Sequence, residues 1–186
     1  MNSQTPSQYK KIIAHCKELF DKKNQDYGTS WRILRLPSCT DQIFIKAKRI
    51  RSIQEKGTQR VSDTIPAEFV GIVNYAIIAL MQIELASDKS LEIDRDRVLD
   101  LYTEIINKNM ILLDNKNHDY DEAWRDMRVE SMTDQILMKL LRIRQIEDNQ
   151  GKTIVSEGVE SIYRDIINYA VFCLIKLNFH NQNENN

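Results

Sequence analysis

Apolar residues recur along the chain at the spacing of an α-helix. Residues 9–23 carry them at positions three or four apart, which places them on one face of a helix. A second helix is expected to begin at Ser38 or Thr40, where a hydroxyl can cap the first turn and Asp41 suits the positive end of the helix dipole. Residues 29–36 allow a short helical turn between the two.

The third expected helix begins near Pro66, because proline is well tolerated in a first turn. It is apolar nearly all round from residue 69 to residue 85, so we expect it to be buried at the centre of the fold. β-branched runs that alternate at the period of a strand are absent. The pattern therefore predicts an all-α protein.

This pattern occurs twice. When the chain is shifted by 93 residues, residues 24–53 align with 117–146 and 16 of the 30 pairs are identical, whereas unrelated segments match at about one position in twenty. We expect a first repeat at 8–86, a linker at 87–93, a second repeat at 94–180 and a disordered tail at 181–186. Two tandem three-helix repeats predict one pseudo-twofold helical bundle, in which the duplication takes the place of a homodimer; a higher oligomer stays open.

Composition and net charge limit the kinds of molecule that the protein is expected to bind. Apolar residues make up 42% of the chain and charged residues 28%, which allows a packed core, and the net charge of −1 gives no electrostatic footprint for duplex DNA or for a membrane. No stretch of 18 uncharged apolar residues and no leader-like apolar segment occurs, and the three cysteines are far apart. We expect a cytoplasmic protein without a disulfide framework or a membrane partner.

Many of the residues that both repeats share are polar, which a core alone does not require. Aromatic side chains could stack on a nucleobase, and lysine and arginine could hold phosphate oxygens. We therefore expect a nucleotide or a phosphorylated small molecule as the partner. The candidate nucleotide-binding residues are Asp26, Tyr27, Trp31, Arg32, Arg35, Lys46 and Arg49 in the first repeat, with Asp119, Tyr120, Trp124, Arg125, Arg128, Lys139 and Arg142 in the second.

Each of these candidates also has a structural interpretation. Lys46 and Arg49 lie one turn apart beside an apolar stripe, and they could instead run along the surface to carboxylates of another helix. Trp31 could plug the end of the bundle while Asp26 pairs with an arginine. Both alternatives stay open from the sequence.

Acidic residues suggest a metal site. Asp165 and Asn168 lie on one face of an apolar helix, and a carboxylate there needs a metal ion, a cation or a hydrogen-bond partner. The candidate metal ligands are Asp41, Glu68, Asp134, Asp165 and Asn168, and Mg²⁺ is the candidate cofactor. The alternatives are a helix-start role for the two aspartates of the second helices, and a salt bridge to Arg49 or Arg142. The Asn-Tyr pairs at 74–75 and 168–169 are expected to anchor a polar network in the core.

The repeated string K-N-x-D-Y-x-x-x-W-R, followed by S-x-T-D-Q-I-x-x-K-x-x-R-I-R and a late N-Y, resembles the nucleotide modification associated domain 1 family over residues 9–180. The layout is also similar to the all-α MazG-type nucleoside triphosphate pyrophosphohydrolases. That resemblance implies Mg²⁺ and cleavage between the α- and β-phosphates. It places Asp41 and Asp134 at the first carboxylate position, and Glu68 or Asp165 with Asn168 at the second.

Two functions follow as hypotheses. The first is a Mg²⁺-dependent nucleotide (pyro)phosphohydrolase that acts on canonical or modified nucleotides. The alternative is a non-catalytic module that binds a nucleotide or nucleic acid, or a scaffold for a nucleotide-modification system. A third interpretation is that the repeated charges only form salt bridges between helices. Ser/His or Cys/His catalysis is not expected, because the three histidines fall at unrelated positions of the repeats.

Overall fold

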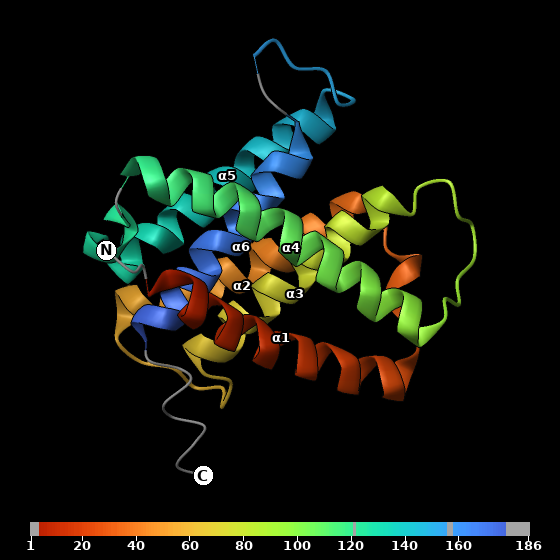
Figure 1. Ribbon diagram of the computed structural model, residues 1–186. Coiled ribbons are helices and arrows are strands. Elements are labelled where there is room, and N and C mark those ends of the chain that lie inside the picture. Colours follow the sequence, from red (N-terminus) through yellow and green to blue (C-terminus); the bar gives the residue numbers. More distant parts are fainter. Residues whose placement is uncertain (1–3, 121, 156–157, 178–186) are drawn as a thin grey trace.

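The computed structural model describes residues 4–120, 122–155 and 158–177, without the side chains of 116–120, and its regular structure there is helical throughout (Figure 1). The first repeat contains α1 (Thr5–Tyr27), the short 3₁₀ helix η1 (Ser30–Ile33), α2 (Leu36–Lys56) and α3 (Ile65–Glu84). The second contains α4 (Arg95–Tyr120), η2 (Ala123–Asp126), α5 (Val129–Asp148) and α6 (Val159–Lys176). The predicted all-α class of two three-helix repeats is confirmed, and the predicted tail at 181–186 lies outside the described residues.

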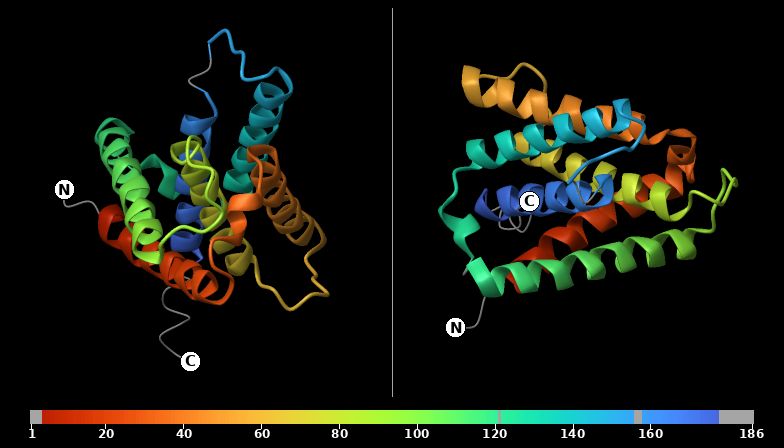
Figure 2. Two further views of the ribbon diagram at one scale, coloured as in Figure 1. Left: turned by 90° about the vertical axis from the view of Figure 1, so that its right-hand side faces the viewer. Right: turned by 90° about the horizontal axis from the view of Figure 1, so that it is seen from above.

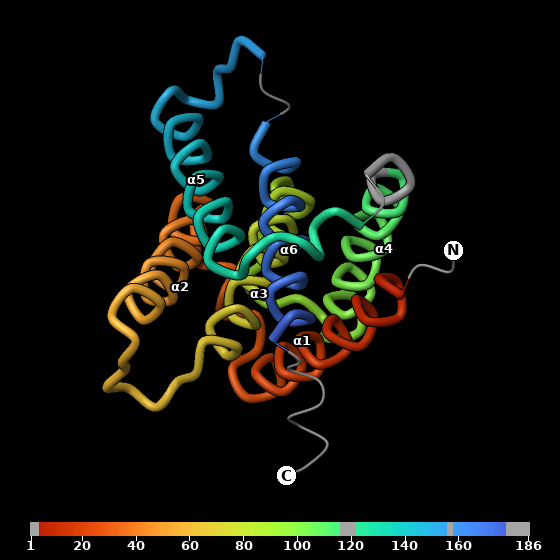
Figure 3. Tube along the Cα trace, turned by 90° about the vertical axis from the view of Figure 1, so that its left-hand side faces the viewer, coloured from red at the N-terminus to blue at the C-terminus, as the bar shows by residue number. Residues whose placement is uncertain are grey.

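The helices form three layers, and each layer takes one long helix from each repeat. Figures 2 and 3 show α2 beside α5 on one side, α3 beside α6 in the middle, and α1 beside α4 on the other side. The middle layer is the most apolar, because its helices are covered from both sides. Among the described residues, α3 alone is long and apolar enough to cross a membrane by composition, and its burial between the outer layers accounts for that composition.

The second helix of each repeat starts earlier than the sequence suggested. α2 begins at Leu36 with Pro37 in its first turn, and α5 begins at Val129. The predicted start at Ser38 or Thr40 is therefore wrong. The extended residue before each helix, Arg35 or Arg128, sets the boundary further upstream in both repeats, although only α2 has a proline in its first turn. Thr40 lies inside the helix, where its hydroxyl oxygen is 3.2 Å from the carbonyl of Leu36.

Two buried tyrosines join the repeats in a reciprocal way. The hydroxyl of Tyr9 in α1 donates to Oδ1 of Asn168 in α6 at 3.0 Å. The hydroxyl of Tyr102, its counterpart in α4, donates to Oδ1 of Asn74 in α3 at 2.9 Å. Each first helix is thus bonded to the third helix of the other repeat, as expected for a self-complementary interface. The predicted polar core network is confirmed for both asparagines.

The two halves of this network differ in the number of hydrogen-bond donors around the asparagine. Asn109 donates to Oδ1 of Asn168 at 2.8 Å and to the hydroxyl of Tyr9 at 2.9 Å. Its counterpart Cys16 has no such donor, and there the amide of Asn74 donates instead to the carbonyl of Cys16 at 3.0 Å. Oδ1 of Asn74 therefore depends on one tyrosine among the described residues.

We predict that Tyr102→Phe destabilises the fold more than Tyr9→Phe. Removal of the Tyr102 hydroxyl leaves Oδ1 of Asn74 buried and unpartnered, which costs about 1–3 kcal/mol. After Tyr9→Phe, Asn109 still donates to Asn168, so no described acceptor is orphaned. Urea denaturation followed by circular dichroism measures both free energies of unfolding. A larger loss for Tyr9→Phe would contradict this assignment.

Candidate functional site

A cavity of about 540 Å³ opens in the first repeat, between the end of α1, η1 and the first turns of α3. Its volume lies in the usual range for small-molecule sites, about 300–1,000 Å³. Four predicted residues lie in its wall, and they come from four elements, α1, η1, α2 and α3. The candidates that line it are Tyr27, Trp31, Lys46 and Glu68.

Aromatic and amide groups form much of this wall. Trp31 and Tyr75 line the cavity, and Tyr27, which is 69% exposed, lies at its mouth. Asn24 is only 8% exposed, and its Oδ1 is buried without a hydrogen-bond partner among the described residues; the same is true of Nε1 of Trp31. Buried polar atoms normally have a partner. Nε1 of Trp124 in the second repeat also lacks one, so Oδ1 of Asn24 is the atom that more clearly marks a place where a ligand could supply a partner.

The end of α1 positions Asn24. The carbonyl of Asn24 accepts the backbone N–H of Gly28 at 2.9 Å, and Gly28 has a positive φ of 58° that turns the chain away from the helix. The turn leads directly into η1, which carries Trp31. The predicted helical turn between residues 29 and 36 is thus confirmed, and it sets the tryptophan opposite the last turn of α1.

The charged part of the wall is paired internally. Glu68 is buried, and its two carboxylate oxygens lie 3.2 Å from Nζ of Lys46 and 2.7 Å from a guanidinium nitrogen of Arg49. Gly71 makes room for the lysine, because a Cβ there would lie 2.8 Å from Cε of Lys46. These contacts agree with the salt-bridge interpretation of the second-helix cations.

In the second repeat the carboxylate has moved by one turn. Lys139 lies 2.7 Å from Asp165, which stands where the first repeat has Gly71. Each repeat therefore keeps a lysine on its second helix and a carboxylate on its third helix, although the carboxylate comes from a different position. Arg142, the counterpart of Arg49, is exposed and forms no ion pair within the described part of the chain.

The second tryptophan is covered by a phenylalanine. The rings of Trp124 and Phe172 are stacked with centroids 4.2 Å apart and planes within 6°, and Trp124 is 7% exposed. The guanidinium of Arg125 lies 4.4 Å from the same tryptophan ring. For Trp124 the interpretation as a plug of the bundle is therefore supported. The side chains of the nearby candidates Asp119 and Tyr120 lie outside the described residues.

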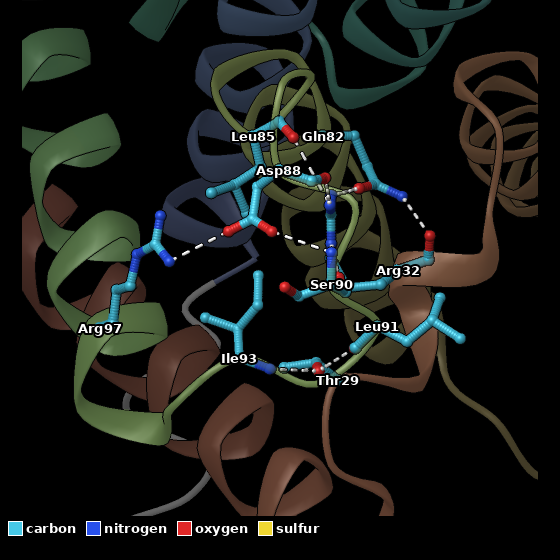
Figure 4. A network of polar contacts seen from close by, with 9 residues as sticks. All are labelled: Thr29, Arg32, Gln82, Leu85, Asp88, Ser90, Leu91, Ile93 and Arg97. Carbon is cyan, nitrogen blue, oxygen red and sulfur yellow. Dashed lines mark hydrogen bonds and ion pairs between the residues drawn. The ribbon is translucent and has the colours of Figure 1, made fainter.

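Arg32 holds the segment between the repeats rather than lining the cavity (Figure 4). It donates to the carbonyls of Ser90 at 3.2 Å and Asp88 at 2.6 Å, and it contacts Gln82. Thr29, one residue before η1, donates to the carbonyl of Leu91 at 2.6 Å. The turn after α1 thus fixes the chain that leads into α4.

Arg125 makes the equivalent contact at the start of the chain. It donates to the hydroxyl of Thr5 at 3.0 Å and to Gln8 at 2.8 Å, both in the first turns of α1, and it pairs with Glu122 at 2.6 Å. Arg125 therefore ties its own repeat to the beginning of the other, whereas Arg32 ties its own repeat to the linker that leads into α4. Arg35, Arg128 and Asp26 are exposed and do not line the cavity.

Asp41 and Asp134 lie at the contact between α2 and α5. Asp41 is 2.6 Å from Arg144, and Asp134 is 3.4 Å from Arg51, which is the reciprocal pair. Oδ1 of Asn168 is already bonded to Tyr9 and Asn109. Within the described residues no group of three His, Cys, Asp or Glu side chains could hold a metal ion.

The comparisons with known proteins give the family. The family model described as nucleotide modification associated domain 1 matches residues 23–83 and 116–177, one segment in each repeat. The chain belongs to this family. No curated protein and no solved structure matches the chain. The distant similarity to MazG-type pyrophosphohydrolases is not confirmed by these comparisons.

The cavity wall also contains residues that were not among the predicted site residues, Asn24, Tyr75 and Ile78 among them. Asn24 and Tyr75 carried a signal, because both repeats have the same residue there, as Asn117 and Tyr169. Ile78 differs between the repeats, since the second repeat has Phe172 at that position. This difference, inside an otherwise similar helix, was the sequence feature that could have indicated that the two repeats have different sites.

We predict that Glu147→Gln raises the melting temperature at neutral pH. Burial raises the pKa of the Glu147 carboxyl, although the hydroxyl of Thr40, which donates to it at 2.8 Å, opposes the rise. A carboxyl whose pKa is raised in the folded state adds stability below its unfolded pKa and loses it as the pH rises through the folded pKa. Gln54, the counterpart in the first repeat, is neutral and donates to Thr133 at 3.1 Å.

The gain should therefore be largest at pH 7–8 and shrink toward pH 4, as measured by thermal denaturation across that range. Glu104→Gln, at an exposed position of α4, is the control and should show little change. A Glu147→Gln variant less stable than the parent at pH 7 would show that the charged carboxylate is needed.

Proposed function

We propose that this protein binds a nucleotide or nucleoside in the cavity of its first repeat. The observation that carries the proposal is the cavity itself. It combines aromatic side chains, two buried polar atoms without partners and two lysines in a space of about 540 Å³. Membership of the nucleotide modification associated domain 1 family supports the same class of ligand.

The wall suits the parts of such a ligand. Tryptophan and tyrosine offer flat faces on which a base can stack, an interaction worth about 1–3 kcal/mol per base. Oδ1 of Asn24 can accept a hydrogen bond from a ring N–H or an amino group. Lys23, exposed at the rim, and Lys46 could contact a sugar or phosphate oxygen.

The contacts favour binding over metal-dependent hydrolysis. Both oxygens of Glu68 face cations, Asp41 and Asp134 are paired with arginines, and Oδ1 of Asn168 is held in the core network. Mg²⁺ in nucleotide sites is usually bound by one or two carboxylates together with waters and substrate phosphates. Here each of these carboxylates would first have to leave its cation, so the proposal involves no metal ion.

The test is a panel of canonical and modified nucleosides and nucleotides, with and without Mg²⁺. Melting shifts and isothermal titration calorimetry measure binding, and a phosphate assay measures turnover. We expect saturable binding that does not require Mg²⁺ and a thermal shift that grows with ligand concentration. Released phosphate or pyrophosphate that depends on Mg²⁺ would instead establish the hydrolase.

Asn24→Ala tests the site within this panel. We expect it to weaken binding about tenfold, which corresponds to about 1.4 kcal/mol for one hydrogen bond to the ligand. It should leave the fold intact, because Oδ1 of Asn24 has no partner to lose. Asn107→Ala, the same change at an exposed position of α4, is the control. Equal binding by both variants would remove Asn24 from the site.

A further inference from the structure

The two repeats differ at the position that faces the tryptophan, and this difference indicates which part of the ligand is recognised. In the second repeat the ring of Phe172 lies parallel to Trp124 at 4.2 Å. In the first repeat Ile78 stands at that position, and both Ile78 and Trp31 line the cavity. Within the described residues, no ring of the protein is stacked on Trp31.

The cavity has no surplus of positive charge. Its charged lining residues are two lysines, Lys23 and Lys46, and two acids, Asp63 and Glu68. Glu68 draws Lys46 and also Arg49 to itself at hydrogen-bond distance. Lys23, at the exposed rim, is the lining cation for which the described residues provide no carboxylate partner, and a polyphosphate would compete with Glu68 for Lys46.

We propose that the site recognises an uncharged aromatic heterocycle, a nucleobase, which stacks on Trp31 in the way that Phe172 stacks on Trp124. An N–H or amino group at the edge of the base donates to Oδ1 of Asn24. The phosphates contribute little, so the ligand class is a nucleoside or nucleoside monophosphate rather than a triphosphate. This inference rests on the proposed function and specifies the ligand of the same cavity.

Tryptophan fluorescence tests the stacking directly, because the chain has only two tryptophans. Trp124→Phe leaves Trp31 as the single fluorophore, and Trp31→Phe leaves Trp124. Each variant is titrated with adenosine, cytidine, guanosine and thymidine, and with their mono- and triphosphates. We expect saturable quenching in Trp124→Phe and none in Trp31→Phe. For the base that binds best, the three phosphorylation states should agree in affinity within about threefold.

Filling the cavity from the protein side gives a second test. Ile78→Phe places a ring where the second repeat has one, so it should reduce affinity at least tenfold while the circular dichroism spectrum stays helical. Ile45→Phe is the same change at a position of α2 that is 60% exposed and outside the cavity, and it should bind as the parent does. If Ile78→Phe does not fold, the fluorescence titration decides alone.

The outcomes separate this inference from the proposed function. A triphosphate that binds more than tenfold tighter than its nucleoside, or quenching that resides in Trp124, would overturn the base-stacking inference and leave nucleotide binding standing. The absence of binding by every nucleoside and nucleotide would overturn the proposed function itself. Quenching of Trp31 with little dependence on phosphates supports both.

Discussion

Tyr9 and Tyr102 occupy equivalent positions of the two repeats, and each of their buried hydroxyls must find a hydrogen-bond acceptor away from water. Tyr9 finds it on α6 and Tyr102 finds it on α3, so each repeat supplies the acceptor for the other. A buried hydroxyl without a hydrogen-bond partner lowers the free energy of unfolding by at least as much as one hydrogen bond contributes. Each of these hydroxyls is satisfied by the opposite repeat, so the two bonds couple the repeats to each other.

The same reciprocity explains many of the polar residues that both repeats share. Asp41 with Arg144 and Asp134 with Arg51 form one interface, Arg125 holds the beginning of α1, and Arg32 holds the linker that leads into α4. Such pairs must be present twice because the contact is self-complementary. Identity between the repeats at these positions reports the pseudo-twofold assembly and needs no ligand to account for it.

The sequence predicted the duplication, the helices and the apolar central helix, because all three follow from local periodicity. It could not assign the repeated charges, since an aspartate and an arginine that occur in both copies can pair within a repeat or across the repeats. The start of α2 was misplaced because Thr40 and Asp41 look like a helix start, whereas the helix already begins after the extended Arg35, and α5 begins at the equivalent residue without a proline. The replacement of Ile78 by Phe172 at the equivalent position of the second repeat could not be interpreted from the sequence, because it depends on the stacking of Phe172 on Trp124 in the folded protein.

The two repeats form a symmetric framework, but they differ at the tryptophan. The first repeat leaves Trp31 beside a cavity, and the second covers Trp124 with a ring of its own. The most direct measurement is the stoichiometry of nucleoside binding by isothermal titration calorimetry on the whole chain. One site per chain is the result that the account predicts. Two equivalent sites per chain would contradict it, because both tryptophans would then have to be open to a ligand.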